Sequence, residues 1–363
     1  MILTTVVFIF ILGLLVFVHE MGHFVAAKIS GIKVEEFAFG FPPRIWSKKH
    51  GETNYSINAI PIGGYVKMLG ESEESQSLRS FSRKKPLIRA VVSVSGVLMN
   101  VVLAWLILSI GFTIGMSPLV SSADSIPGKK LSTSVIVAGV GESTPASKAG
   151  IKPGDILIRG GMVGETKTEF LELSSVINFS QSHINSKIEL VLKRDNQEQM
   201  VTATVSDNKE APLGISIVEN SVVRVPFYLS PVVAFREIIR IIGINLEFLK
   251  DFFTLLFSTG KVSKEVGGPV AIYVLTGVAA KAGVMVVAQF IAILSISLAL
   301  INIMPFPALD GGRLLFIVLE KIFRRKLVKE NIENVIHSVG FVLIILLAIL
   351  ITYKDIVNFV INK

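Results

Sequence analysis

The chain has 363 residues, of which 51% are hydrophobic, and its mean hydropathy of +0.64 excludes an ordinary water-soluble protein. Its formal net charge is +8, but the basic residues cluster beside the apolar runs, where lipid headgroups and membrane topology explain them without nucleic acid. There is no cysteine, so disulfides and thiolate metal sites are excluded, and any metal must be held by histidine, aspartate or glutamate.

Four segments are long and apolar enough to cross a bilayer core of about 30 Å as helices. We predict spans at residues 2–27, 87–116, 284–304 and 335–353. The first has neither the basic start nor the small-residue cleavage site of a signal peptide, so we interpret it as a retained span. Lysine and arginine crowd between the first two spans and between the last two, which predicts cytoplasmic loops there and extracytoplasmic termini.

The first span contains the sequence HEMGH. Residues four apart lie on one face of a helix, so His19 and His23 can bind one metal ion, and neutral imidazoles suit zinc. Glu20 then lies beside the site, placed to take a proton from a coordinated water and pass it to a leaving amine. Because ionisable groups are costly within a membrane, we favour a metalloprotease site over a buried cluster of packing residues.

The loop after this span predicts a β-hairpin. The segment ETNYSINAIPIGGYVKML alternates in character and is interrupted by proline and by Gly-Gly, so we place a hairpin loop at about residues 50–70. The first two spans and this hairpin make up an N-terminal membrane part, residues 1–116.

Residues 117–220 are interpreted as a separate extracytoplasmic domain, because the composition there becomes polar and β-rich. STSVIVAGV, KIELVLKR and QMVTATVS predict strands, and TPASKAGIKPGDILI predicts a turn, a helix cap and a strand. Residues 221–283 are interpreted as an amphipathic interfacial segment. Within it, charges recur against an apolar face in VAFREIIRIIGINLEFLKDFFTLLFS, residues 233–258, which predicts an interfacial helix pair rather than a fifth span. Residues 284–363 form a C-terminal membrane part.

The end of the third span supplies a candidate for the third metal ligand. His19 lies about 25 Å along its span at 1.5 Å per residue, so its partner must lie near the cytoplasmic end of another span. The third span ends there in SLALINIMPFPALDGGR, where Pro305 and Pro307 forbid a regular helix. We predict Asp310 as the ligand, the alternative being a turn aspartate before two glycines.

Asn100, Asn302 and His337 are polar residues of the later spans that could have a role in function. Asn100 can bind the substrate backbone or an oxyanion, and it is equally suited to holding helices together. Asn302 lies close to the broken end of the third span, which favours a role in function. His337, early in the fourth span, is interpreted as an interfacial or packing residue rather than a ligand.

Two motifs in this order resemble a known family. HEMGH followed by NIMPFPALDGGR is similar to the pattern HExxH and NxxPxPxLDG of the site-2 protease family of intramembrane zinc metalloproteases. FPPRIWSKKHGETNYSINAIPIGGYVKMLGE resembles the cytoplasmic membrane-reentrant β-hairpin of its bacterial regulator-of-sigma-E protease branch, and TPASKAGIKPGDIL resembles the bacterial PDZ signature. The resemblance implies a polytopic α-helical membrane protein with four transmembrane helices, that hairpin, and one inserted extracytoplasmic PDZ-like α/β domain.

The resemblance implies one zinc ion per chain, bound by His19, His23 and Asp310, with Glu20 as the general base. It implies an endopeptidase of the bacterial inner membrane that acts on single-pass membrane proteins, such as a pre-trimmed anti-sigma factor or remnant signal peptides. Two rivals stand beside it. One is a PDZ-bearing membrane scaffold or chaperone without proteolytic activity, and the other is a zinc transporter.

The resemblance also suggests where substrate is bound. Asn302 would contact substrate near the metal, and Asn100 matches the GxxxN motif of the branch, with Gly96 as its glycine.

The hairpin would hold substrate as an extended strand, because a helical substrate hides its carbonyl groups in internal hydrogen bonds. Tyr55, Gly63 and Gly64 are the residues expected to do this. The PDZ-like domain is expected either to bind a peptide C-terminus through APLGISI, residues 211–217, or to act as a size filter.

Overall fold

The computed structural model describes residues 2–71, 75–194, 197–208, 210–260, 267–325, 328 and 330–357. The chain forms two compact units. One consists of Met1–Ser109 together with Ala234–Lys363, and we call it the membrane unit. The other, Ile110–Val233, is rich in strands, and we call it the inserted unit.

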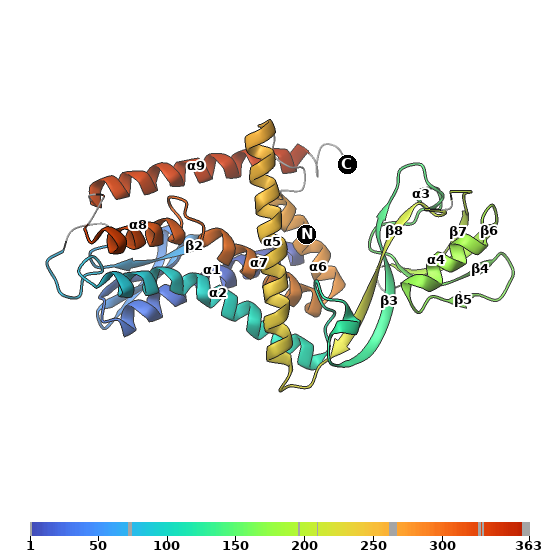
Figure 1. Cartoon of the computed structure of the whole chain (residues 1–363), viewed down its shortest axis with the longest axis horizontal. Helices are drawn as coiled ribbons and strands as arrows, with labels where there is room; N and C mark the ends of the chain where they lie inside the picture. The colour runs from blue at the N-terminus through green and yellow to red at the C-terminus, as the bar shows by residue number, and fades with distance from the viewer. Residues whose placement is uncertain are drawn as a thin grey trace. The chain divides into compact units, whose positions relative to one another are not determined.

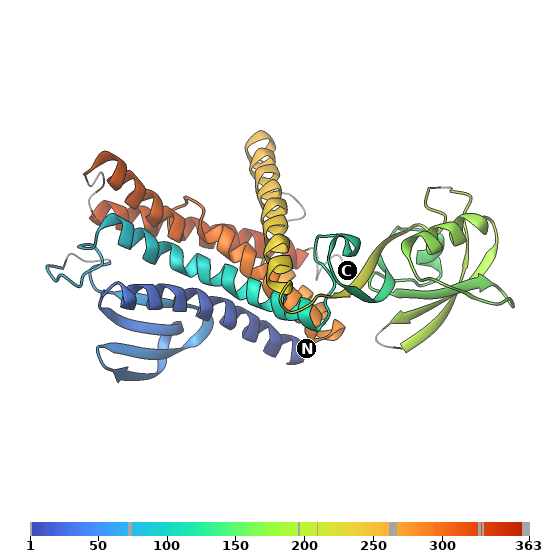
Figure 2. The same ribbon diagram turned by 60° about the horizontal axis from the view of Figure 1, so that its bottom comes forward.

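Four helices are long and apolar enough to cross a membrane, as the sequence predicts. They are α1 (Ile2–Ile29), α2 (Pro86–Ile114), α7 (Val284–Asn302) and α9 (Glu330–Ile356). Helices α1, α2 and α7 run side by side (Figure 2), and Ile11 and Leu15 of α1 pack with Ile291 of α7. Helix α9 packs least, with 6% of its most apolar window buried.

The hairpin between α1 and α2 consists of β1 (Val34–His50) and β2 (Thr53–Met68), which pair antiparallel and fold back on themselves. Phe37 of β1 pairs with Val66 on one side and with Tyr55 on the other. The two long strands therefore make a sheet of four short segments, in the order 64–68, 34–39, 54–58 and 44–50.

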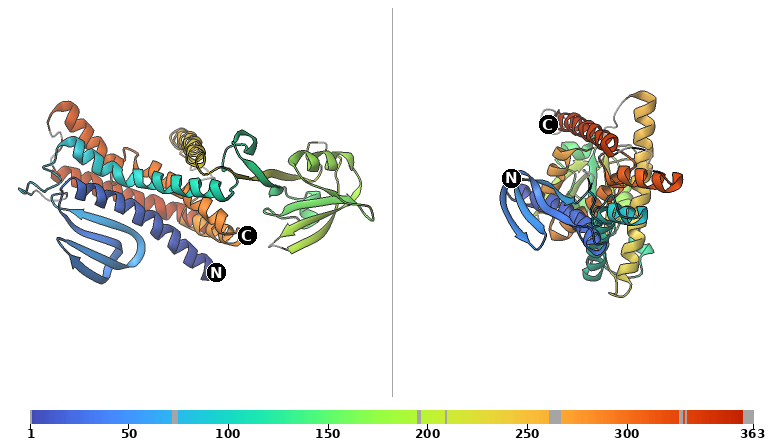
Figure 3. Two further views of the ribbon diagram at one scale, coloured as in Figure 1. Left: turned by 90° about the horizontal axis from the view of Figure 1, so that it is seen from below. Right: turned by 90° about the vertical axis from the view of Figure 1, so that its left-hand side faces the viewer.

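This hairpin is longer than the sequence predicts. Its turn lies at Gly51 and Glu52, so the whole of β1 precedes the predicted region at about residues 50–70. Two adjacent prolines, Pro42 and Pro43, interrupt β1, and this interruption hides its pattern in the sequence. The sheet lies against α1 (Figure 3, left), where Phe37 and Val66 are buried in one apolar cluster with Ala27 of α1.

The third span ends where its prolines predict. Helix α7 stops at Asn302, and α8 (Asp310–Phe323), which the sequence did not predict, begins at Asp310. A Cβ at Gly311 would lie 2.1 Å from the carbonyl oxygen of Ile303, and one at Gly312 would lie 2.4 Å from that of Phe306. The two glycines therefore let the first turn of α8 pack directly on the 303–309 loop.

The predicted interfacial helix pair is instead one continuous helix, α5 (Ser230–Thr259). It is not among the candidate membrane spans of the described residues. A second, apolar helix, α6 (Pro269–Ala282), follows and packs on α1 (Figure 1), where Tyr273 contacts the Phe8 ring edge-on and hydrogen-bonds Thr5. Asp355 at the end of α9 accepts hydrogen bonds from the backbone N–H groups of Gly268 and Ala271, both at 2.9 Å.

The inserted unit is built on one six-stranded sheet. Its strands are β3 (Lys129–Val140), β4 (Ile156–Met162), β5 (Thr168–Glu169), β6 (Lys187–Arg194), β7 (Gln197–Thr204) and β8 (Ile215–Arg224). They follow the order β7-β6-β4-β3-β8, with β5 paired to β4. The three strands predicted in this part are therefore confirmed.

Two short α-helices and one 3₁₀ turn, Ala123–Ser125, also belong to the inserted unit. Helix α3 (Pro145–Lys148) begins after Thr144, whose hydroxyl caps it by accepting the Ser147 N–H, as the TPASKAG segment predicts. Helix α4 (Leu173–Ser182) buries Val176 and Phe179 in the core of the unit. The unit thus has its own hydrophobic core, independent of the membrane unit.

Candidate metal centre

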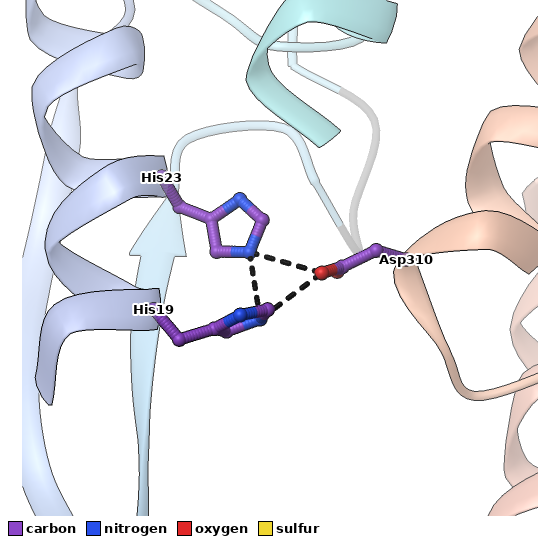
Figure 4. Close-up of side chains that lie close together, drawn as sticks. All are labelled: His19, His23 and Asp310. Carbon is purple, nitrogen blue, oxygen red and sulfur yellow. Dashed lines mark hydrogen bonds and ion pairs between the residues drawn. The ribbon is translucent and has the colours of Figure 1, made fainter. Parts of the chain in front are cut away.

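The two histidines of HEMGH and the aspartate that begins α8 meet in the membrane unit. The Nε2 atoms of His19 and His23 lie 3.0 Å and 3.2 Å from Oδ2 of Asp310, and 3.2 Å from each other (Figure 4). Both histidines are 8% exposed. The structure therefore brings together the three ligands predicted from the sequence, although Asp310 lies far from the histidines along the chain.

The spacing of these atoms fits a single zinc ion. Tetrahedral zinc with bonds of about 2.0–2.1 Å separates its ligand atoms by about 3.3 Å. The three measured separations, 3.0–3.2 Å, are close to that value. Two imidazoles and one carboxylate also leave the fourth coordination position open, which is typical of catalytic rather than structural zinc sites.

Helix α2 supplies the contacts that orient both histidines. The Nδ1 atom of His23 lies 2.8 Å from the backbone carbonyl of Val92, and Nδ1 of His19 lies 3.3 Å from the side-chain amide of Asn100. With each Nδ1 engaged by α2, each Nε2 faces Asp310. Such hydrogen bonds fix the tautomer of a metal-binding histidine and raise its basicity.

Zinc binding at Nε2 of His19 leaves the ring proton on Nδ1, so Asn100 must accept it through Oδ1. The oxygen and nitrogen of an amide differ little in shape, and a half-turn of the Asn100 amide places Oδ1 on that proton. Oδ1 is otherwise a buried acceptor without a partner among the described residues, so the half-turn also satisfies it. Asn100 is fully buried, and this contact with His19 is the position that the structure gives it.

Gly96 creates the space that the metal needs. A Cβ built on it would lie 2.3 Å from Nε2 of His23 and 2.9 Å from Nε2 of His19. Val92, Gly96 and Asn100 are four residues apart and share one face of α2. The sequence analysis identified Asn100 as a polar residue within a span and Gly96 only through a motif. It missed Val92, because a backbone carbonyl leaves no trace in the side-chain pattern.

A cavity of about 560 Å³ opens onto the metal ligands and onto Glu20. One wall is the 64–68 segment of β2, through Tyr65, Val66 and Met68. Another is α9, with lining residues Ser338, Phe341 and Val342. Glu20 therefore lies beside the metal ligands in a space large enough for several residues of a peptide.

Two glycines let β2 pass close to α1, the helix that carries His19 and His23. A Cβ at Gly64 would lie 3.2 Å from Cγ of Glu20 and 2.9 Å from the carbonyl oxygen of Ala38. Gly63 has a φ of +103°, a conformation that side-chain-bearing residues rarely adopt. Gly63 and Gly64 thus bring the strand next to Glu20.

The remaining predicted residues lie elsewhere. Tyr55 packs against the Phe24 and Phe37 rings, at centroid distances of 6.0 Å and 6.2 Å, in the apolar layer between hairpin and α1. Asn302 is the last residue of α7 and is half-buried. Neither is among the described residues that line the cavity.

Three residues that the sequence analysis gave no role in the site also line the cavity. Arg313, in the first turn of α8, forms an ion pair with Glu71, and the attraction of that carboxylate raises the pKa of Arg313, so the guanidinium stays charged. His337 of α9 accepts a hydrogen bond from the backbone N–H of Ala308. No sequence pattern marks these residues, because their partners come from distant parts of the chain.

Comparison with known proteins agrees with this site. The sequence profile of peptidase family M50 matches residues 7–347. A protein of Clostridium perfringens named "Putative zinc metalloprotease" is 36% identical over 348 residues, covering 94% of this chain and 95% of the relative. A protein with the same description from Clostridium acetobutylicum is 34% identical over 354 residues, covering 97% of each.

A plant protein is similar over the same extent. Membrane metalloprotease ARASP, chloroplastic, of Arabidopsis thaliana is 28% identical over 355 residues, covering 95% of this chain and 77% of the relative. The profile match, the four apolar helices and the convergence of His19, His23 and Asp310 lead to one conclusion. The chain belongs to peptidase family M50 and is a multi-pass membrane zinc metalloprotease that hydrolyses peptide bonds.

Proposed function

We propose that the protein is an intramembrane endopeptidase of the regulator-of-sigma-E protease branch, which cleaves single-pass membrane proteins. Its substrates would be a pre-trimmed anti-sigma factor or remnant signal peptides. One observation carries the proposal: the 64–68 segment of β2 lines the cavity beside the metal ligands. This segment pairs with β1 on one side, and no other described strand pairs with it.

An edge strand next to the metal ligands suits a transmembrane substrate. A substrate that leaves its helical form can add to this edge as an extended strand, with main-chain hydrogen bonds replacing those it loses. The added strand would present one carbonyl group to the metal ligands. Tyr65 belongs to this edge segment and lines the cavity, whereas the predicted Tyr55 does not line it.

The proposed chemistry assigns one role to each group of the site. Zinc, when bound by His19, His23 and Asp310, would act as a Lewis acid that lowers the pKa of the attacking water and polarises the substrate carbonyl. Glu20 takes the proton of the attacking water and delivers it to the leaving nitrogen. Asn100 keeps His19 in the tautomer that the metal requires.

The outer half of the hairpin supports a membrane-reentrant placement on the cytoplasmic side of a bacterial inner membrane. Ile45 is 70% exposed and Trp46 is 49% exposed, which is unusual for apolar side chains in water. Basic residues flank them, namely Arg44, Lys48 and Lys49. Apolar side chains beside lysine and arginine suit the boundary between acyl chains and headgroups.

We propose that the inserted unit is a PDZ-like domain on the outer side of the membrane. Strand β8 is at one edge of its sheet, and the 211–217 segment leads into it. Gly214 has a φ of +70° in that segment, and a tight glycine loop before an edge strand suits capture of a peptide carboxylate. The alternative role, a size filter for bulky substrates, needs no peptide binding.

Replacement of Glu20 by glutamine tests the proposed function. Glu20→Gln keeps the shape of the side chain and leaves all three metal ligands in place, so bound zinc should equal that of the wild type. Cleavage of a single-pass model substrate in detergent should fall by about 10²–10⁴-fold, the usual contribution of a general base. Equal cleavage by the two proteins would contradict the mechanism.

The rival scaffold function makes the opposite prediction for cells. A scaffold or chaperone does not use Glu20 as a base, so its cellular role would survive Glu20→Gln. A protease would instead leave its membrane substrates uncut and accumulating in the membrane fraction. Immunoblots of a tagged single-pass substrate in cells that make either form separate the two functions.

A further inference from the structure

One turn of α9 contacts the 303–309 loop, which leads directly into Asp310. The backbone N–H of Ala308 donates a hydrogen bond of 2.9 Å to Nδ1 of His337. Ala308 lies two residues before Asp310 and has a φ of +75°. Residues with a Cβ rarely adopt this left-handed conformation, and it persists only where surrounding contacts enforce it.

A second close contact fixes the same loop. A Cβ at Gly340 would lie 2.5 Å from Cβ of Pro307 and 2.6 Å from its carbonyl oxygen. His337 and Gly340 are three residues apart and therefore share one face of α9. This face contacts Pro307 and Ala308, whereas most of α9 is exposed.

The hydrogen bond specifies the protonation of the ring. Because Nδ1 accepts from Ala308, the ring is neutral and carries its proton on Nε2. The ring also stands edge-on to Phe316 of α8, with the centroids 5.8 Å apart. His337 is therefore held by both α8 and the loop before it, beside the metal-binding cavity that it lines.

We propose that His337 is a positioning residue, which places Asp310 against His19 and His23 by holding Ala308 in its left-handed conformation. The inference concerns the zinc site and does not depend on the identity of the substrate. It connects the least buried span to a metal ligand through the loop residues that precede Asp310. Since Ser338, Phe341 and Val342 of the same helix line the cavity, α9 both walls the cavity and holds Asp310 in place.

Two replacements separate the hydrogen bond from the bulk of the ring. His337→Asn keeps an acceptor, because its amide oxygen can occupy the place of Nδ1, but it loses the ring. His337→Phe keeps the ring and its contact with Phe316 but has no acceptor. Val339→Ala is the control, since Val339 is 54% exposed on α9 and is not among the described residues that line the cavity.

The primary measurement is the rate at which each purified protein loses zinc to a chelator, together with the visible absorption of the cobalt-substituted form. His337→Phe should lose zinc about 10-fold faster and show a weaker, broader cobalt band. His337→Asn and Val339→Ala should stay close to wild type. On a peptide substrate, His337→Phe should lower kcat more than it changes KM.

Two outcomes would overturn the proposal. One is a His337→Phe protein with the zinc loss and cobalt spectrum of the wild type. The other is His337→Asn losing zinc as fast as His337→Phe, which would show that an acceptor at this position does not by itself hold Asp310 in place. Should His337→Phe fail to fold, His337→Leu replaces it in the same comparison. Zinc loss and the cobalt band need no membrane substrate, so they test His337 even if the proposed substrate class is wrong.

Discussion

The metal ligands depend on a glycine that has no chemistry of its own. Gly96 lies on the face of α2 that meets His19 and His23, and a Cβ there would occupy the position between their Nε2 atoms. In a helix, alanine is otherwise favoured over glycine by about 1 kcal/mol. Glycine at this position therefore costs helix stability, and the space it leaves accounts for its presence.

Gly96→Ala should therefore abolish zinc binding without unfolding α2. We expect less than about one tenth of the wild-type zinc in the purified protein, measured by atomic absorption, because the methyl group would overlap Nε2 of His23. Leu98→Ala is a suitable control, since Leu98 is 58% exposed on the same helix. Full zinc occupancy in Gly96→Ala would show that the metal lies elsewhere.

Sequence patterns revealed those site residues whose chemistry or spacing is distinctive. His19 and His23 are four apart in an apolar helix, and Asp310 follows prolines that break a span at the matching depth. Val92, Tyr65 and His337 stayed hidden for a different reason. A backbone carbonyl, an edge-strand side chain and a histidine on a later helix acquire their roles only through tertiary contacts.

At the level of elements, the predictions succeeded where one pattern filled a whole segment. The four spans and the strands of the inserted unit agree with the structure, because hydrophobic length and alternation are local signals. The alternation pattern missed strand β1 because its prolines interrupt the pattern, and only the family resemblance, which begins at Phe41, included its second half. Helix α5 was taken for two helices, yet Gly243 near its middle has open space around it and does not end the helix.

The junction of α6 and α9 depends on one buried carboxylate. Asp355 is 1% exposed and accepts two backbone N–H groups at the start of α6, which helix geometry leaves without partners. Asp355→Ala should lower stability by roughly 1–3 kcal/mol, the cost of leaving buried donors unpaired. Asp355→Asn should lose less, because its amide oxygen still accepts.

The measurement is the midpoint of thermal unfolding in detergent, with Tyr353→Ala as the control, since Tyr353 is 69% exposed on the same helix. If Asp355→Ala unfolds at the same midpoint as the control, water must replace Asp355 as the hydrogen-bond acceptor for the backbone N–H groups of Gly268 and Ala271.

At the scale of the whole molecule, the inserted unit enters and leaves through neighbouring strands. Lys129 at the start of β3 pairs with Arg224 at the end of β8, and the backbone N–H of Val225 donates to the carbonyl of Phe112. The two connections to the membrane unit therefore lie close together, the arrangement in which a domain insertion is best tolerated. This explains how a chain can hold a complete β-rich unit between its second and third spans.

The predicted topology can be tested with single cysteines, because the chain has none of its own. Glu165→Cys places a thiol on an exposed loop of the inserted unit, and Lys48→Cys places one on the exposed outer half of the hairpin. A membrane-impermeant maleimide added to intact spheroplasts should label the first and not the second. After permeabilisation both should react. Labelling of Lys48→Cys but not of Glu165→Cys in intact spheroplasts would show that the orientation is opposite to the one proposed.

The separation of the metal ligands along the chain determines when the enzyme can become active. His19 and His23 lie in the first span, whereas Asp310 follows the third, so a ribosome must add residues 24–310 after His23 before all three ligands exist. Synthesis at about 5–20 residues per second makes this a delay of many seconds. During that time the growing chain shares the membrane with other new proteins but lacks one of its three metal ligands, so an unfinished copy has no complete catalytic centre with which to cut them.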